Sequence, residues 1–170
     1  VFDATEVVGR EMTAAEVLDI VCRDIIFYDE SGGGATFSGG EPLCQAEFLC
    51  ALLDGCRERG VRTAVDTSGQ ADGETFARAS RRADLVLFDV KLVDAARHEA
   101  FAGVRNDAIL ANLRRRSEEG GAMLVRLPPS ARNGSYRSPS SLPIRCRRIL
   151  SVYCLLPTNS MARMMTAGVA

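Results

Sequence analysis

Short apolar runs alternate with helical patterns along the first 127 residues. Runs with the length and flanking turn residues of strands cover 35–37, 61–65, 84–90 and 121–127. The run at 84–90 is almost continuously apolar, which is typical of a strand buried on both faces. Strands that alternate with helices at this spacing predict right-handed βαβ units and a parallel sheet. The pattern therefore indicates an α/β fold.

Apolar residues at helical spacing fill the intervals between these runs. Residues with this spacing cover 13–28, 48–56, 72–82 and 106–119. Thr13-Ala14-Ala15-Glu16 is a capping box, so we expect a first helix from about Thr13 to Tyr28. Gly60 ends the second helix in the usual left-handed position.

The regular pattern stops at Leu127. Residues 128–143 are rich in Pro, Ser and Arg, which is typical of a loop or a disordered segment, and the apolar stretch 149–156 could form a strand. Residues 126–170 contain seven Arg and no acidic residue. We therefore divide the chain into a core of residues 1–127 and an irregular tail of residues 128–170.

The composition fits one globular domain. The 170 residues are 46% hydrophobic and 25% charged, which allows a sizeable core but not two full domains. No apolar run approaches the length of a membrane span, and the amino end does not have the form of a signal peptide, so we expect a cytoplasmic protein. The formal net charge of −1 argues against a nucleic-acid partner.

A glycine-rich loop follows the first short strand. Ser38, Gly39, Gly40 and Glu41 lie at its carboxyl end, before Pro42. Adjacent glycines leave the backbone bare, so that a ligand can touch its amides and carbonyls, and Glu41 adds a fixed negative charge. Such a loop suits a ligand with an ammonium group. The alternative is a tight strand-to-helix turn in which the glycines only satisfy the backbone geometry.

Polar residues also lie at the carboxyl ends of the next three strands. In chain order they are Asp66, Thr67, Ser68, Asp89, Lys91 and Arg126. Parallel α/β sheets place their ligands at the carboxyl ends of the strands. If the strands are neighbours, the carboxylates can bind the amine of a zwitterion and the cations its carboxylate. Ribose hydroxyls could use the remaining acids.

Each of these residues also has a plain structural interpretation. Asp66 and Asp89 could cap strand ends, Lys91 could be a solvated loop cation, and Arg126 could be an ion-pair partner. His98, the one histidine of the chain, is interpreted as a surface turn residue rather than a catalyst.

Several classes of chemistry find little support in the sequence. It contains no Ser-His-Asp arrangement and no Walker loop, which disfavours hydrolase and phosphoryl-transfer functions. Six cysteines occur without any Cys-x2-Cys pair, so we assign no metal ligand and no catalytic residue. Cys22 and Cys56 lie at apolar positions of expected helices and are interpreted as small core residues.

At these positions the chain resembles the glycyl-radical-enzyme activating enzymes of the radical SAM superfamily, such as the pyruvate formate-lyase activating enzymes. The resemblance covers about the first 127 residues. The matching residues are 8–13, 27–28, 31–45, 63–69, 84–91, 98–103, Asn106, 109–110 and 112–113. This combination is much more specific than Gly-Gly-Glu-Pro alone.

The resemblance implies a partial (β/α) barrel that binds S-adenosylmethionine against a 4Fe-4S cluster. An electron from the cluster would cleave the sulfonium, and the resulting 5'-deoxyadenosyl radical would take hydrogen from a glycine of a partner enzyme. It also implies a flavodoxin or ferredoxin-type electron donor. Neither a nucleic acid nor a membrane is expected as a partner.

The resemblance also assigns roles to individual residues. Gly39, Gly40 and Glu41 would hold the methionyl amine, with Ser38 preceding them. The methionyl carboxylate would lie beside Asp66, Thr67 and Asp89, with Ser68 nearby and a monovalent cation as an optional link. Lys91 would contact the carboxylate or the ribose, and Arg126 would reach the same ligand.

The chain departs from the family in two places. The family holds its cluster with a Cys-x3-Cys-x2-Cys loop that the resemblance places before Val1, and the family pattern is lost after Leu127. We therefore expect a barrel incomplete at both ends, in a fragment that is inactive by itself. A non-catalytic α/β binding or interaction protein that keeps this scaffold is the alternative.

Overall fold

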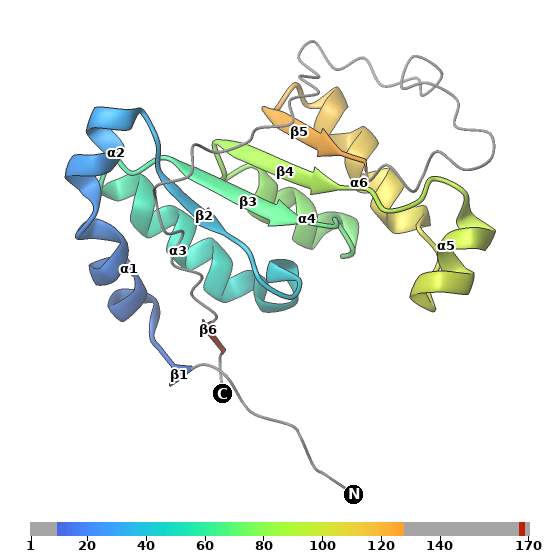
Figure 1. Ribbon diagram of the computed structural model, residues 1–170, viewed down its shortest axis with the longest axis horizontal. Helices are drawn as coiled ribbons and strands as arrows, with labels where there is room; N and C mark the ends of the chain where they lie inside the picture. Colours follow the sequence, from blue (N-terminus) through green and yellow to red (C-terminus); the bar gives the residue numbers. More distant parts are fainter. Residues whose placement is uncertain (1–9, 128–166, 169–170) are drawn as a thin grey trace, which may run out of the picture.

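The computed structural model describes residues 10–127 and 167–168 (Figure 1). Its helices and strands, in chain order, are β1 (Arg10–Glu11), α1 (Ala14–Cys22), α2 (Ile25–Ser31), β2 (Ala35–Phe37), η1 (Pro42–Gln45), α3 (Ala46–Glu58), β3 (Thr63–Thr67), α4 (Gly73–Ser80), β4 (Leu85–Asp89), α5 (Ala95–Ala102), α6 (Asp107–Glu118), β5 (Met123–Arg126) and β6 (Ala167–Gly168). None of the helices in this part of the chain is long and apolar enough to cross a membrane.

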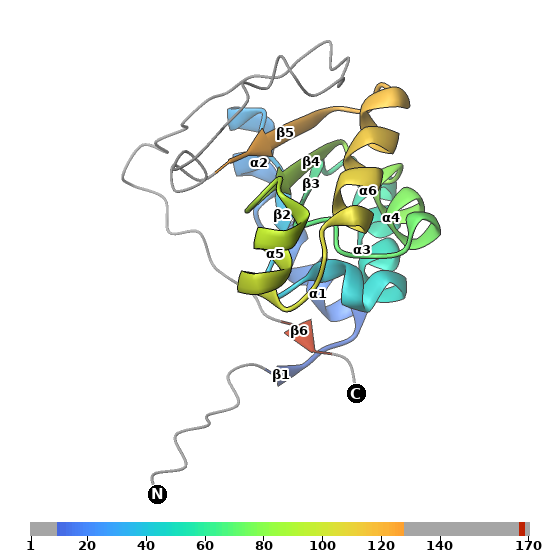
Figure 2. The same ribbon diagram turned by 90° about the vertical axis from the view of Figure 1, so that its right-hand side faces the viewer.

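The central feature is a four-stranded sheet in the order β2-β3-β4-β5, in which all neighbouring strands are parallel. Helices α3, α4 and α6 lie along one face of this sheet, and α5 lies beyond the carboxyl ends of the strands (Figures 1 and 2). The predicted parallel α/β fold is confirmed. Because sequential strands are neighbours, the loops that follow β2, β3 and β4 emerge side by side at one edge.

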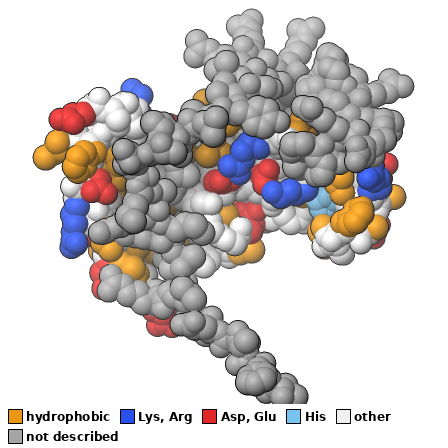
Figure 3. All heavy atoms as spheres, in the orientation of Figure 1, with side chains coloured by type: hydrophobic (Ala, Val, Ile, Leu, Met, Phe, Trp, Pro, Cys, Tyr) orange, Lys and Arg blue, Asp and Glu red, His pale blue; other side chains and the backbone are white. Residues whose placement is uncertain are grey.

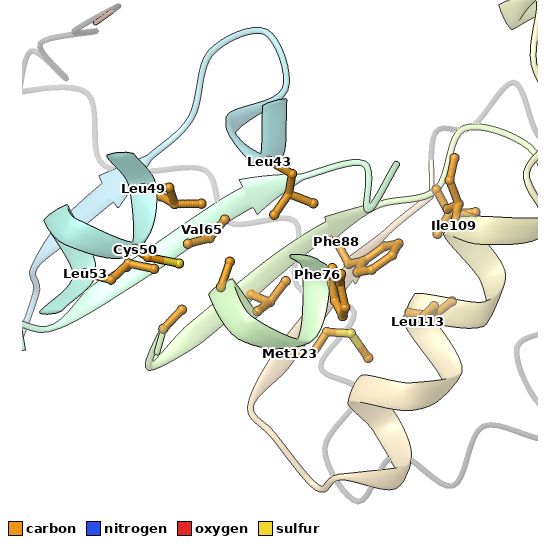
Figure 4. Close-up of a cluster of buried hydrophobic side chains, with 14 residues drawn as sticks. Leu43, Leu49, Cys50, Leu53, Val65, Phe76, Phe88, Ile109, Leu113 and Met123 are labelled. Carbon is orange, nitrogen blue, oxygen red and sulfur yellow. The ribbon is translucent and has the colours of Figure 1, made fainter. Parts of the chain in front are cut away.

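The main core lies between the sheet and these helices. Alternate residues of β3 and β4 face it, and Val65, Val86 and Phe88 are at most 2% exposed. Phe76 of α4 meets the ring of Phe88 edge-on, with 5.8 Å between the ring centroids (Figure 4). Met123 of β5 joins the same cluster, so three strands share one core.

A smaller cluster fixes α1 against α3. Val17 and Leu18 of α1 pack with Leu52, Cys56 and other buried residues. Cys56 is 0% exposed, which confirms its interpretation as a core residue, whereas Cys22 is half-buried.

The prediction of one helix over 13–28 is wrong, because the chain breaks between α1 and α2. The amide of Asp24 donates to the carbonyl oxygen of Val21 at 3.3 Å, which tightens the turn after α1. The carbonyl oxygen of Asp24 then accepts from the amide of Phe27 at 3.0 Å, at the start of α2. Aspartate is a poor residue for a helix interior, since its side chain competes for backbone groups. No residue of α2 is fully buried.

The sequence pattern also missed α5. Asp94 caps this helix by accepting from the amide of Arg97 at 2.8 Å, and Gly103 ends it with a φ of +73°. His98 is only 5% exposed, and its Nδ1 lies 2.7 Å from the carbonyl oxygen of Val104. The interpretation of His98 as a surface turn residue is therefore wrong: the imidazole is a buried polar group that holds the end of α5.

Several expectations lie outside the described residues. They are the irregular tail over 128–166, the apolar stretch 149–156 and the family match at residues 8–9. At the boundary of the described part, β1 pairs in parallel with β6, with Arg10 opposite Ala167.

Candidate functional site

The polar loop residues predicted from the sequence meet at one edge of the sheet. Strands β2, β3 and β4 end at Phe37, Thr67 and Asp89, and the loop after each carries part of the predicted set. In the register of the sheet, Asp89 lies beside Arg126, the last residue of β5. Space filling shows acidic and basic side chains gathered over the strand ends, on the face that Figure 1 turns to the viewer (Figure 3).

Glu41 joins the loop after β2 to the loop after β3. Its Oε1 accepts from Thr67 Oγ1 at 2.5 Å and from the amide of Leu43 at 3.2 Å. Its Oε2 accepts from the Ser68 amide at 3.0 Å and from Ser68 Oγ at 2.6 Å. Hydrogen bonds to a charged acceptor are stronger than neutral ones. This carboxylate, which already has four donors, therefore acts as a link between two loops.

The Gly39-Gly40 turn presents bare backbone beside this link. Gly39 has a φ of 99° and Gly40 a φ of 50°, values that residues with a Cβ rarely adopt. A Cβ built on Gly40 meets no atom of the described residues within 4 Å, so none of them crowds this part of the turn. The turn thus fits a ligand that binds to main-chain groups. Ser38, which precedes it, is exposed.

A second set of side chains consists of Asp66, Asp89, Lys91 and Arg126, and we call it the charged cluster. Arg126 forms an ion pair with Asp66 and lies 3.9 Å from an oxygen of Asp89. Lys91 pairs with the other oxygen of Asp89. Two carboxylates thus face two cations, so the expected monovalent cation is not needed for charge balance, and the structure gives it no support.

Thr67 and the charged cluster point to opposite faces of the sheet. Thr67 is 3% exposed and lies on the helix-covered face, whereas the side chain of the preceding Asp66 remains 22% exposed. Asp89 and Arg126 share a register position, so their side chains leave the same face of the sheet. The structure therefore brings all the predicted site residues to one edge, but in two groups that meet along Asp66-Thr67-Ser68.

The described cysteines do not form a cluster site. Among the described residues, no three His, Cys, Asp or Glu side chains are grouped so that they could hold a metal ion. Burial raises the pKa of Cys56 to about 11, with the nearby Cys22 adding to the shift, and burial also raises the pKa of Cys50. Thiols of this kind are poor metal ligands at neutral pH, because the thiolate is the binding form. These residues do not fit a 4Fe-4S cluster.

Two buried asparagines hold the site loops, and the sequence pattern did not predict this role for them. Asn106 and Asn112 are 0% and 2% exposed, and both bind backbone carbonyls of the site loops. A signal was present in the pattern, because Asn112 lies between Ile109 and Leu113 on the apolar face of its helix. A buried amide on such a face needs a specific hydrogen-bond partner.

No family model matches the chain. Curated proteins do match it. It is 41% identical over 127 residues to the trans-4-hydroxy-L-proline dehydratase activating enzyme of Clostridioides difficile. It is 42% identical over 125 residues to the choline trimethylamine-lyase activating enzyme of Oleidesulfovibrio alaskensis, and each alignment covers 74% of this chain. These matches confirm the resemblance to the glycyl-radical-enzyme activating enzymes over this segment.

Further matches carry the name of an activating enzyme of the same kind. The pyruvate formate-lyase-activating enzyme of Clostridium pasteurianum is 44% identical over 95 residues. A crystal structure of a domain of pyruvate-formate lyase-activating enzyme from Bacteroides vulgatus has a TM-score of 0.52 and 42% identity, over 56% of this chain and 60% of that one. This similarity confirms the partial radical SAM-type fold. The chain spans about two fifths of the curated relatives, covering 42% of the first and 40% of the second.

Proposed function

We propose that residues 10–127 bind S-adenosylmethionine at the carboxyl ends of β2 to β5, as part of a glycyl-radical-enzyme activating enzyme. The observation that carries the proposal is the convergence of a bare Gly39-Gly40 turn, the Glu41 link and the charged cluster at one sheet edge. The similarity of this segment to the glycyl-radical-enzyme activating enzymes supports it. The whole enzyme's activity and partners are part of the same proposal.

The Gly-Gly turn would receive the methionyl amine. Main-chain carbonyls accept hydrogen bonds from an ammonium group without the clash that a Cβ would cause. Glu41 contributes a negative charge nearby, and its bonds to Thr67 and Ser68 keep the turn in place. We assign the amine contact to the backbone of Gly39 and Gly40, with Glu41 as its electrostatic support.

The charged cluster would receive the methionyl carboxylate and the ribose. Arg126 offers planar guanidinium donors that suit a carboxylate, and its side chain is 42% exposed. Lys91, which is 64% exposed, can turn toward either ligand group. Asp66 and Asp89 orient these cations through their ion pairs and can accept from ribose hydroxyls.

When bound, S-adenosylmethionine would supply the group that takes hydrogen from a glycine of the partner glycyl radical enzyme. Its reductive cleavage requires an electron from a 4Fe-4S cluster, and we expect the cluster's cysteine ligands outside the described residues. A flavodoxin or ferredoxin-type protein would reduce the cluster. The contribution of this segment is to bind and orient the cofactor.

Replacing Arg126 with glutamine should weaken the affinity of the 170-residue chain for S-adenosylmethionine at least tenfold. Charge-assisted hydrogen bonds are about twice as strong as neutral ones, and the change removes the cation while leaving two carboxylates next to the ligand carboxylate. Isothermal titration calorimetry measures the dissociation constant of each variant, with circular dichroism reporting the folded fraction.

Arg81→Gln is the matched control. Arg81 pairs with Glu119, and its side chain is 62% exposed. We expect the control to bind S-adenosylmethionine as the unchanged chain does. Equal affinities of the Arg126→Gln variant and the unchanged chain would contradict the assigned role. Absence of any binding by the unchanged, folded chain would overturn the proposed function.

A further inference from the structure

Two asparagines of the α6 segment bind the two loops that carry the site. Asn112 donates through Nδ2 to the carbonyl oxygens of Gly69 and Ala71, at 3.0 and 2.9 Å. Asn106 donates through Nδ2 to the carbonyl oxygens of Leu92 and Val93, at 2.8 and 2.9 Å. The same contact thus occurs twice: once on the loop after β3 and once on the loop after β4.

Neither asparagine is placed to strengthen its helix. Asn106 occupies the N-cap position of α6, where its side-chain oxygen would ordinarily accept a backbone amide, but it makes no capping bond. Instead, its Nδ2 faces the loop, and its buried Oδ1 has no hydrogen-bond partner within the described part of the chain. Asn112 lies within α6, where asparagine is a weak helix former, and it is buried at a cost that only hydrogen bonds offset.

A chain of hydrogen bonds runs from Asn112 to the glycine turn. The carbonyl of Gly69 accepts from Asn112, and the amide of Gly69 donates to Thr67 Oγ1 at 2.9 Å. Thr67 Oγ1 donates in turn to Glu41 Oε1 at 2.5 Å. Each step has normal hydrogen-bond geometry, so the position of the α6 amide is transmitted to the loop after β2.

We propose that Asn106 and Asn112 are positioning residues, which hold the loops after β4 and β3 in the conformation that binds S-adenosylmethionine. The inference rests on the proposed function. Asn112 sets the Asp66–Gly69 segment through Gly69, and Asn106 sets the segment around Lys91 through the next residue, Leu92. By fixing both loops before the ligand arrives, the two amides lower the ordering cost of binding.

A purely structural role would have a different outcome. In that case the amides would only satisfy loop carbonyls, and their loss would lower stability without changing the affinity of the molecules that remain folded. The two roles therefore separate when affinity is measured per folded molecule and loop order is measured directly.

The experiment compares Asn112→Leu, Asn112→Ser and Leu113→Ala in the 170-residue chain. Leucine has a similar size but no donor, whereas serine keeps one donor. Leu113 is the adjacent core residue, 2% exposed, and its truncation should lower the urea midpoint of unfolding without removing a loop contact. Hydrogen–deuterium exchange over residues 66–71 and calorimetric titration with S-adenosylmethionine are measured for each variant under conditions where it is folded.

Asn112→Leu should speed exchange over 66–71 at least tenfold relative to the unchanged chain and weaken binding at least tenfold. Asn112→Ser should lie between them, and Leu113→Ala should bind within twofold of the unchanged chain. Unchanged exchange at 66–71, or unchanged affinity, in Asn112→Leu would overturn the inference and leave the proposed function standing. If the unchanged chain does not bind at all, the proposed function fails, and the positioning role fails with it.

Asn106→Leu is an independent second variant in case Asn112→Leu does not fold. It should speed exchange over residues 91–93 and weaken binding at least fivefold, while exchange over 66–71 stays close to that of the unchanged chain. Exchange that rises equally in both loops would indicate a general loosening of α6 and would contradict separate positioning by the two amides.

Discussion

Replacing Gly69 with alanine is expected to lower the free energy of unfolding by about 3–4 kcal/mol. The residue has a φ of +75°, which alanine adopts only with strain, and a Cβ at this position would lie 2.2 Å from Cζ of Phe88. Phe88 is 0% exposed, so its ring has no free space into which to move. Urea unfolding followed by circular dichroism measures the change.

The variant Gly60→Ala separates the cost of backbone strain from the cost of steric overlap with Phe88. Gly60 has a φ of +72°, but a Cβ there meets none of the described atoms within 4 Å, so only strain of about 1–2 kcal/mol is expected. Phe88→Leu tests the overlap itself, because Gly69→Ala should cost less in that background than in the unchanged chain. An equal cost in both backgrounds would show that the ring does not limit this position.

Replacing Glu41 with alanine should lower the free energy of unfolding by about 3 kcal/mol, because hydrogen bonds to a charged group contribute about 1.5–3 kcal/mol each and part of this is lost to solvent. The change leaves Thr67 Oγ1, Ser68 Oγ and two backbone amides without their acceptor. Because the same carboxylate links two site loops, affinity for S-adenosylmethionine should fall at least tenfold. Urea unfolding and calorimetric titration give the two quantities.

Glu47→Ala is the control for this change. Glu47 pairs with Arg78 at 2.6 Å, but its side chain is 82% exposed. An exposed pair of this kind contributes less than about 1 kcal/mol. If Glu41→Ala is no more destabilising than Glu47→Ala, the hydrogen bonds of Glu41 do not hold the loops together, and its role as a link is wrong.

The strands were predictable because each leaves a short apolar run bounded by turn residues, although only alternate residues of β4 are fully buried rather than both faces. Residues 84–90 contain β4 (Leu85–Asp89), and 35–37 coincide with β2 (Ala35–Phe37). The helix α5 was not predictable, since its one fully buried side chain is His98. The apolar pattern does not mark a polar residue as part of the core. His98 can be buried because folding brings the carbonyl oxygen of Val104 within hydrogen-bonding distance of its ring.

The site was predictable by position but not by pairing. Three polar segments lie at the ends of predicted strands, so their shared edge could be expected from the chain order alone. The ion pair between Asp66 and Arg126 joins residues 60 apart, and it depends on the register of two strands that are not direct neighbours. Sequence pattern does not encode that register. The hydrogen bonds of Glu41 to Thr67 and Ser68 could not be predicted either, because they join loops that lie far apart in the sequence.

The balance of the charged cluster has a consequence for how a ligand would arrive. Asp66 and Asp89 offset Arg126 and Lys91 within a few ångströms, so little field would extend into solvent beyond the Debye length of about 8 Å at physiological ionic strength. Encounter with a small cationic molecule would then proceed by unassisted diffusion and would be insensitive to added salt. The protein would recognise the ligand only on contact, when the charged groups of the ligand compete with the ion pairs of the charged cluster.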